Sequence, residues 1–294
     1  MNGPAINEEF LQQLETLQTI VKNNVAGLFG GNHQSKTFGS SCEFADYRDY
    51  IAGDDITKID WNAYARFEKL YLKLYLDERQ LHTRIYIDAS RSMGYGKGGK
   101  DIQAIRTAAA LTYLSINEMD KVSVYVIHGD KIEELFTGLL GKDAYFAAID
   151  KFNGIVFDGD CRISDAILPS TVGYGDGLSI IISDFLTDNN FEDAIDYLAG
   201  KKRDILCVQI LSAEELNPTA RGKMHFFDSE ATSKYYRKNI NKDILAAYKA
   251  AVEYSTGRVR DFCHSREADY MLVPANESLY KVFFDKLVGE GVLK

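Results

Sequence analysis

The alternation of strand-like and helix-like segments after Thr83 constrains the fold of this chain more than any other feature. Short apolar runs have the length and β-branched content of buried strands, at 84–88, 122–127, 178–183, 205–211 and 270–273. Between or after these strands lie segments in which apolar residues recur at helical spacing, at 102–118, 144–152, 191–198, 243–254 and 278–288. Strands alternating with helices in this way are typical of a parallel sheet covered on both faces. The sequence therefore predicts an α/β fold with a doubly wound, mostly parallel sheet, with one hairpin strand at 132–136.

The first 80 residues have a different pattern. Apolar residues recur at helical spacing between Ile6 and Val21, and a loop rich in Gly and Ser follows at 27–41. From Leu70 to Leu76 leucine alternates with Tyr and Lys, which is the period of a strand with one buried face. We expect residues 1–80 to form a helix, a loop and a β extension packed on an α/β domain at 81–294.

Composition excludes several functional classes. The formal net charge of −9, without a cluster of Lys and Arg, argues against a nucleic-acid partner. No run of about 18 apolar residues is present, so neither a membrane span nor a signal peptide is expected. The cysteines contain no CxxC spacing, which favours reduced thiols and a cytoplasmic protein; they are Cys42, Cys161, Cys207 and Cys263.

A candidate metal site follows the strand at 84–88. Asp88, Ser90 and Ser92 alternate along the loop after the strand, so their oxygens can turn toward one point. Asp184 follows the strand at 178–183 and supplies a second carboxylate if the two strands are neighbours. Hard oxygen ligands suit Mg²⁺ or Mn²⁺, and a divalent cation would neutralise two close carboxylates. The alternative is that these side chains only cap the helices that follow.

These residues carry a family resemblance. The Asp88-x-Ser90-x-Ser92 pattern with Asp184 resembles the metal-ion-dependent adhesion site (MIDAS) of von Willebrand factor A domains. A longer signature is similar to the bacterial family called domain of unknown function 58, DUF58, and consists of Arg48-Asp49-Tyr50, Gly53-Asp54-Asp55, Ile59-Asp60-Trp61 and Ala65-Arg66. The resemblance implies a von Willebrand A-like α/β domain, genes that often lie beside MoxR-type AAA+ ATPases, and no established catalytic activity.

One segment departs from the A-domain pattern. A-type domains place Gly-Gly-Thr before a short helix, and the threonine is a metal ligand; this chain has Gly159-Asp160-Cys161-Arg162-Ile163-Ser164 there. Cys161 is a soft and poorly matched ligand for Mg²⁺, while Ser164 could fill the position or could cap the following helix. We therefore expect the metal site to be weak or vacant.

The charged signature has two interpretations. Asp54 and Asp55 follow Gly53, which is turn chemistry, while Arg48, Asp60 and Arg66 could form an ion-pair network that pins this region to the main sheet. Alternatively the signature is a surface that engages a partner, with Trp61 as an aromatic anchor. On the structural interpretation Trp61 belongs to the core.

A further motif resembles a phosphate-binding loop but lacks one of its required residues. The stretch from Gly94 to Lys100 has the GxxxxGK spacing of a phosphate-binding loop, but Asp101 stands where a Ser or Thr hydroxyl should reach Mg²⁺. An acid at that helix N-terminus would also repel phosphate. We interpret the stretch as a flexible glycine loop over the metal edge.

The sequence thus predicts a non-enzymatic binding or scaffold protein. It would engage a protein partner through the carboxyl edge of the sheet, and the resemblance implies an AAA+ ATPase as that partner. The alternative from a different class is a metal-dependent phosphoester hydrolase using Asp88 and Asp184.

Overall fold

The computed structural model describes residues 4–24, 44–75, 81–94, 99–175, 177–186, 191–219, 222–227 and 235–283. The chain divides into two compact units. The small unit spans residues 30–80, and the main unit comprises 1–29 and 81–294. In this division the N-terminal helix belongs with the main unit, whereas the sequence pattern grouped it with the β extension in residues 1–80.

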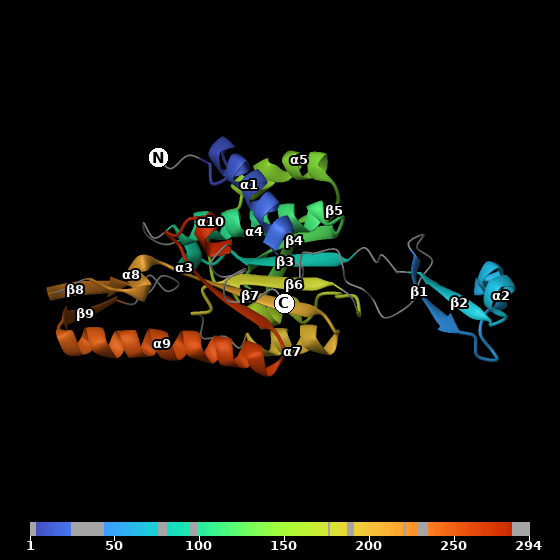
Figure 1. Cartoon of the computed structure of the whole chain (residues 1–294). Helices are drawn as coiled ribbons and strands as arrows, with labels where there is room; N and C mark the ends of the chain where they lie inside the picture. The colour runs from blue at the N-terminus through green and yellow to red at the C-terminus, as the bar shows by residue number, and fades with distance from the viewer. Residues whose placement is uncertain are drawn as a thin grey trace. The chain divides into compact units, whose positions relative to one another are not determined.

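Six strands of the described chain form one sheet in the main unit (Figure 1). They are β3 (His82–Asp88), β4 (Lys121–His128), β5 (Lys131–Leu139), β6 (Leu178–Ser183), β7 (Asp204–Leu211) and β10 (Asp269–Pro274). The spatial order is β10-β7-β6-β3-β4-β5, and only β5 is antiparallel to its neighbour. This topology confirms the predicted doubly wound α/β fold, with β3 and β6 side by side at its centre.

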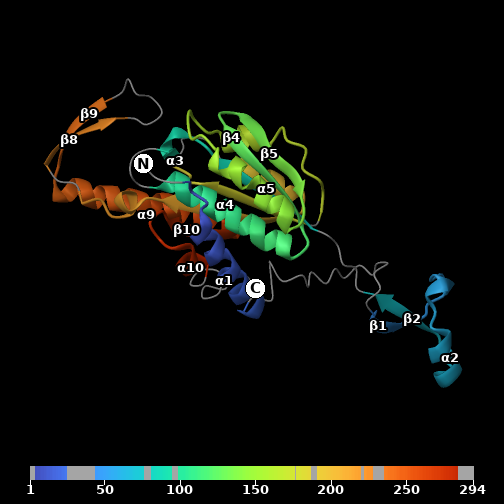
Figure 2. The ribbon, with the colours of Figure 1, turned by 90° about the horizontal axis from the view of Figure 1, so that it is seen from above.

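Helices cover both faces of the sheet and create two cores. One face is covered by α1 (Glu8–Asn24), α4 (Lys100–Asn117), α5 (Lys142–Asn153) and α10 (Leu279–Lys281). The other face is covered by α6 (Ile163–Ile167), α7 (Glu192–Gly200) and α9 (Lys242–Ser265). Figure 2 shows α4 beside α5, and the three alanines at 108–110 of α4 are fully buried because small side chains allow close packing there.

Three short elements complete the main unit. Helix α3 (Arg91–Gly94) follows β3, and helix α8 (Ala213–Leu216) follows β7. A hairpin of β8 (Gly222–Phe227) and β9 (Tyr235–Ile240) precedes α9 and was not expected from the sequence. The last helix, predicted over 278–288, is observed as α10, and the part beyond residue 283 lies outside the described residues.

The described part of the small unit, residues 44–75, contains an antiparallel pair of strands and two short helices. These are β1 (Phe44–Asp49), the 3₁₀ helix η1 (Ile56–Lys58), α2 (Trp61–Phe67) and β2 (Tyr71–Tyr75). The alternation from Leu70 to Leu76 correctly predicted β2, in which Leu72 is buried. Helix α2 was not predicted, because seven residues are too few to show a clear helical period.

Three of the cysteines lie in the described chain. Cys161, Cys207 and Cys263 are buried thiols outside any disulfide, and Cys42 and the predicted loop at 27–41 fall outside the described residues. Within the same ranges no helix has both the length and the apolarity needed to cross a bilayer.

Candidate binding site at the carboxyl edge of the sheet

The four oxygen-bearing residues singled out in the sequence come together at one edge of the sheet. Strands β3 and β6 pair in parallel with Ile87 opposite Ile182, so both strands end at the same level. The Ser92 hydroxyl donates to Asp184 Oδ2 at 2.8 Å, and the Ser90 and Ser92 hydroxyls are 3.0 Å apart. The structure therefore joins Asp88, Ser90, Ser92 and Asp184 in one cluster.

Asp88 is fully buried beneath this cluster. Its Oδ1 accepts from the Ser90 backbone N–H at 2.8 Å, and its Oδ2 accepts from the Ser183 hydroxyl at 2.5 Å. Burial raises the pKa of Asp88, and the nearby carboxylate of Asp184 raises it further, while the serine hydrogen bonds oppose the change. The Asp88 carboxylate therefore has protein donors on both of its oxygens.

Asp184 is paired with a lysine that sequence reasoning did not place in the site. The Lys100 ammonium lies 2.9 Å from Asp184 Oδ2 and 2.7 Å from Glu215 Oε1, and the side chains of Lys100 and Asp184 are only 4% and 1% exposed. Burial by itself would lower the pKa of Lys100, but the two carboxylates outweigh it and raise this pKa above its ordinary value. Lys100 is therefore a buried, charged partner of both carboxylates.

Glu215 is held in place by its own helix. Ser212 and Glu215 form a capping box at the start of α8, with the Ser212 N–H donating to Glu215 Oε2 at 2.7 Å. The other carboxylate oxygen is left for Lys100. We call Asp88, Ser90, Ser92, Ser183, Asp184, Lys100 and Glu215 the edge network.

The position of the missing threonine is occupied by a thiol. Cys161 is buried beside Asp88, and burial followed by the charge and hydrogen bonding of Asp88 raises the pKa of this thiol. Ser164 is placed elsewhere, because its hydroxyl accepts from the Ala194 N–H at 3.1 Å at the start of α7. Of the two residues considered for that position, Cys161 is therefore the one seen beside Asp88.

Exposed side chains surround the edge network. Arg91 pairs with Asp158 at 2.6 Å, and the Asp158 N–H donates to the Ala89 carbonyl at 2.9 Å, which ties two loops together at this edge. The Arg91 guanidinium holds the pKa of Asp158 below its usual range. Leu186, whose N–H donates to Asp184 Oδ1, is 42% exposed. We call Arg91, Asp158 and Leu186 the edge rim.

The donor set does not fit a divalent cation while Lys100 is in place. Both oxygens of each aspartate already accept hydrogen bonds from protein groups, and the Lys100 ammonium supplies positive charge directly beside Asp184. Cys161 replaces a hard oxygen ligand. Among the described residues, no three His, Cys, Asp or Glu side chains are grouped so as to hold a metal ion.

Three members of the edge network were missed by sequence reasoning, although each leaves a signal. Extending the β3–β6 register by one residue places Ser183 opposite Asp88. Lys100 begins α4, where a cation opposes the helix dipole and so needs anions nearby, and Ser212 with Glu215 has capping-box spacing. Residues 95–98 of the GxxxxGK stretch lie outside the described residues, and the Lys100 ammonium is bound by carboxylates.

The signature residues lie in the small unit and form local contacts. Arg48 pairs with Asp54 at 2.8 Å, and Asp55 caps η1 by accepting from Thr57. The Arg48 guanidinium and the Ile51 N–H lower the pKa of Asp54, and hydrogen bonds from Thr57 lower that of Asp55. The turn interpretation of these two aspartates is therefore supported.

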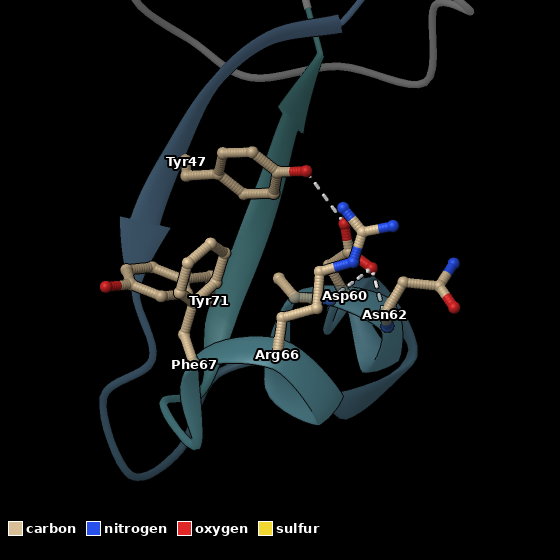
Figure 3. Close-up of a pocket in the computed structure, with 7 residues that line it drawn as sticks. Tyr47, Asp60, Asn62, Arg66, Phe67 and Tyr71 are labelled. Carbon is tan, nitrogen blue, oxygen red and sulfur yellow. Dashed lines mark hydrogen bonds between the residues drawn. The ribbon is translucent and has the colours of Figure 1, made fainter.

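The predicted network of Arg48, Asp60 and Arg66 is wrong. Asp60 caps α2 and accepts from the Tyr47 hydroxyl at 2.8 Å (Figure 3). The Lys73 ammonium lies 3.3 Å from Asp60, and no ion pair joins Asp60 to either arginine in the described chain. The Tyr47 hydroxyl and the N–H groups at the start of α2 lower the pKa of Asp60 despite its burial.

The expectation that Trp61 is a core residue is also wrong. It is 61% exposed and packs edge-on against Tyr64, because it occupies the first position of a helix that turns only Ala63 inward. A pocket of about 530 Å³ lies next to this helix and is lined by Tyr47, Asp60, Asn62, Ala63, Arg66, Phe67 and Tyr71 (Figure 3).

Solved structures and curated proteins provide three comparisons. A von Willebrand factor type A protein from Catenulispora acidiphila is 12% identical with a TM-score of 0.43, over 76% of this chain and 43% of its own. An aerotolerance-related membrane protein from Bacteroides fragilis is 15% identical with a TM-score of 0.40, over 72% and 98%. Uncharacterised proteins of Mycobacterium bovis and Mycobacterium tuberculosis are each 23% identical over 239 residues, covering 79% of this chain and 74% of theirs.

The family match agrees with the signature found in the sequence. It covers residues 46–258, which is most of the chain, and includes the signature around Asp54 as well as the edge network. Because both units contribute to that match, this chain belongs to the family described as "Protein of unknown function DUF58".

Proposed function

We propose that this chain is a non-enzymatic protein-interaction domain that engages its partner at the carboxyl edge of the sheet. The observation that carries the proposal is the edge network, in which side chains from β3, β6, α4 and α8 are held by hydrogen bonds and ion pairs. In open α/β sheets the carboxyl ends of the strands are where ligands bind. A charged cluster such as the edge network, held rigidly beneath exposed side chains, is a suitable base for a docking surface.

The edge rim supplies the groups that a partner would contact. Leu186 offers exposed apolar surface, and the guanidinium of Arg91, whose side chain is 38% exposed, can receive a carboxylate of the partner in exchange for Asp158. Such an exchange costs little because exposed ion pairs contribute only about 0–1 kcal/mol. An acidic side chain flanked by apolar residues is therefore the chemistry that fits this rim.

A MoxR-type AAA+ ATPase is the partner that we propose, acting with this chain in the assembly or maturation of other proteins. The support for this partner is the resemblance to DUF58 proteins, whose genes often lie beside such ATPases. Both proteins would then meet in the cytoplasm, which is consistent with the buried thiols of Cys161, Cys207 and Cys263.

The test is calorimetry with the purified MoxR-type ATPase from the same genome. Arg91→Ala and Leu186→Ala alter side chains that are 38% and 42% exposed, and should leave the fold intact. We expect each to weaken binding about tenfold, because truncating a central contact residue costs above about 1 kcal/mol. Asp204→Ala is the matched control, since Asp204 is an exposed carboxylate at the opposite edge of the same sheet.

Two outcomes would contradict the proposal. One is a complex of equal affinity for wild type, Arg91→Ala and Leu186→Ala, which would place the contact surface elsewhere. The other is the absence of binding by the wild-type chain in every nucleotide state of the ATPase, which would remove this partner.

A further inference from the structure

A built-in cation occupies the carboxyl edge of the sheet. The Lys100 ammonium bridges Asp184 and Glu215 at 2.9 and 2.7 Å, and its side chain is almost completely buried. We propose that Lys100 takes the place of a divalent cation at this site, so that the edge network is complete without a metal. This inference concerns the same edge as the proposed function but does not require a partner.

The position of Lys100 is unfavourable for a lysine unless anions surround it. Lysine is almost never buried unless it is paired, and the first turn of the 18-residue helix α4 is an unfavourable place for a cation because the helix dipole is positive there. Two carboxylates, one directly after β6 and one on α8, converge on this one ammonium. Glu215 is fixed in turn by Ser212, so the bridge is held from both sides.

A metal ion and the Lys100 ammonium would exclude each other. An ion bound to Asp184 Oδ2 would lie about 2.1 Å from that oxygen, and the Lys100 ammonium is 2.9 Å from the same oxygen. The two cations would thus be within about 5 Å, in a buried place where charges are poorly screened. Moving Lys100 away would in addition leave Glu215 without its buried partner.

The site nevertheless retains most of a metal cradle beneath the lysine. Asp88, Ser90, Ser92 and Asp184 present two carboxylates and two hydroxyls in contact with one another. Removal of the Lys100 charge leaves these aspartates close together without a neutralising group. A chain lacking the ammonium should therefore acquire the metal affinity that the wild-type chain lacks.

The experiment titrates Mn²⁺ alone against the full chain, with free Mn²⁺ measured by electron paramagnetic resonance. We expect no saturable binding to wild type in the millimolar range. Lys100→Met should bind one Mn²⁺ at least about 100-fold more tightly than wild type, and Mn²⁺ should raise its melting temperature. The double variant Lys100→Met/Asp184→Asn removes both charges together, and should fold without metal and bind none.

The Mn²⁺ titrations give results that either support or contradict the role of Lys100. One-to-one Mn²⁺ binding by wild type at micromolar concentration, lost in Asp88→Asn, would overturn the inference. A folded Lys100→Met chain that binds no Mn²⁺ would do the same. If Lys100→Met does not fold in EDTA, refolding that requires Mn²⁺ supports the inference, and failure to refold with Mn²⁺ contradicts it. Because the probe is the metal alone, these results stand whether or not the ATPase binds.

Discussion

Loss of the Asp184 carboxylate should destabilise the main unit far more than loss of the Glu215 carboxylate. Both side chains bind the Lys100 ammonium, but Asp184 is 1% exposed and Glu215 is 26% exposed. Removing one partner of a buried ion pair costs about 3–5 kcal/mol, because it leaves an uncompensated charge. Replacing a partly exposed partner costs much less.

The contacts of each residue refine the expected magnitudes. Asp184→Ala also removes the acceptor for the Ser92 hydroxyl, worth about 1 kcal/mol, but it relieves the repulsion of Asp88 and leaves Glu215 on Lys100. We expect a net loss of about 3 kcal/mol, or a melting temperature lower by about 6–12 °C. Glu215→Ala loses a capping box and should cost about 1 kcal/mol.

Urea unfolding monitored by far-ultraviolet circular dichroism measures the free energy of unfolding of both variants. The signal reports on the main unit, because most described helices lie there. Fluorescence of Trp61, the only tryptophan, reports separately on the small unit. Equal costs for the two variants, or a larger cost for Glu215→Ala, would refute the argument that burial makes Asp184 the dominant partner of Lys100.

Three further predictions test the main unit. Gly177→Ala should cost about 2–3 kcal/mol by urea unfolding, because φ is +141° and an added Cβ would meet Arg203 and lie 2.6 Å from the His82 carbonyl; a neutral result would contradict this packing. Burial, helped by nearby arginines and a lysine, lowers the pKa of His82 to about 4. Between pH 6.5 and 4 the imidazole of His82 therefore binds a proton in the unfolded chain but not in the folded chain. The free energy of unfolding should fall by about 1–2 kcal/mol as the pH is lowered across this range, a value reduced to allow for the partial exposure of His82. His82→Gln should remove this dependence of stability on pH. Phe10→Ala should cost about 3–5 kcal/mol in the same assay, because Phe10 joins α1 to the core, and a loss below about 1 kcal/mol would mean that α1 is not docked.

The sheet could be predicted because each of its strands shows a local pattern of apolar residues in the sequence. The run at 178–183 coincides with β6, and all of its residues are buried, so a continuous apolar stretch carried the full signal. The neighbourhood of Asp88 and Asp184 followed from topology, since the two carboxylates end adjacent parallel strands. These inferences needed no information on side-chain packing.

The rest of the site depended on contacts between distant segments. Lys100, Asp184 and Glu215 are separated by more than 30 residues along the chain, and no local pattern indicates that an ammonium on α4 meets a carboxylate on α8. Trp61 was assigned to the core because apolar residues are usually buried, but its exposure follows from its position at the start of α2. For both Lys100 and Trp61, the position in the fold and not the residue type determined whether the side chain is buried.

Site-specific photocrosslinking can show whether a protein partner docks on the carboxyl edge of the sheet. A photoreactive amino acid is placed at Leu186 on the edge rim or, as the control, at Asp204 on the opposite edge, and each chain is irradiated with the purified MoxR-type ATPase in EDTA. We expect a covalent complex from position 186 and none from position 204. Crosslinks from 204 alone, or from neither position while the two proteins still bind, would contradict docking at this edge.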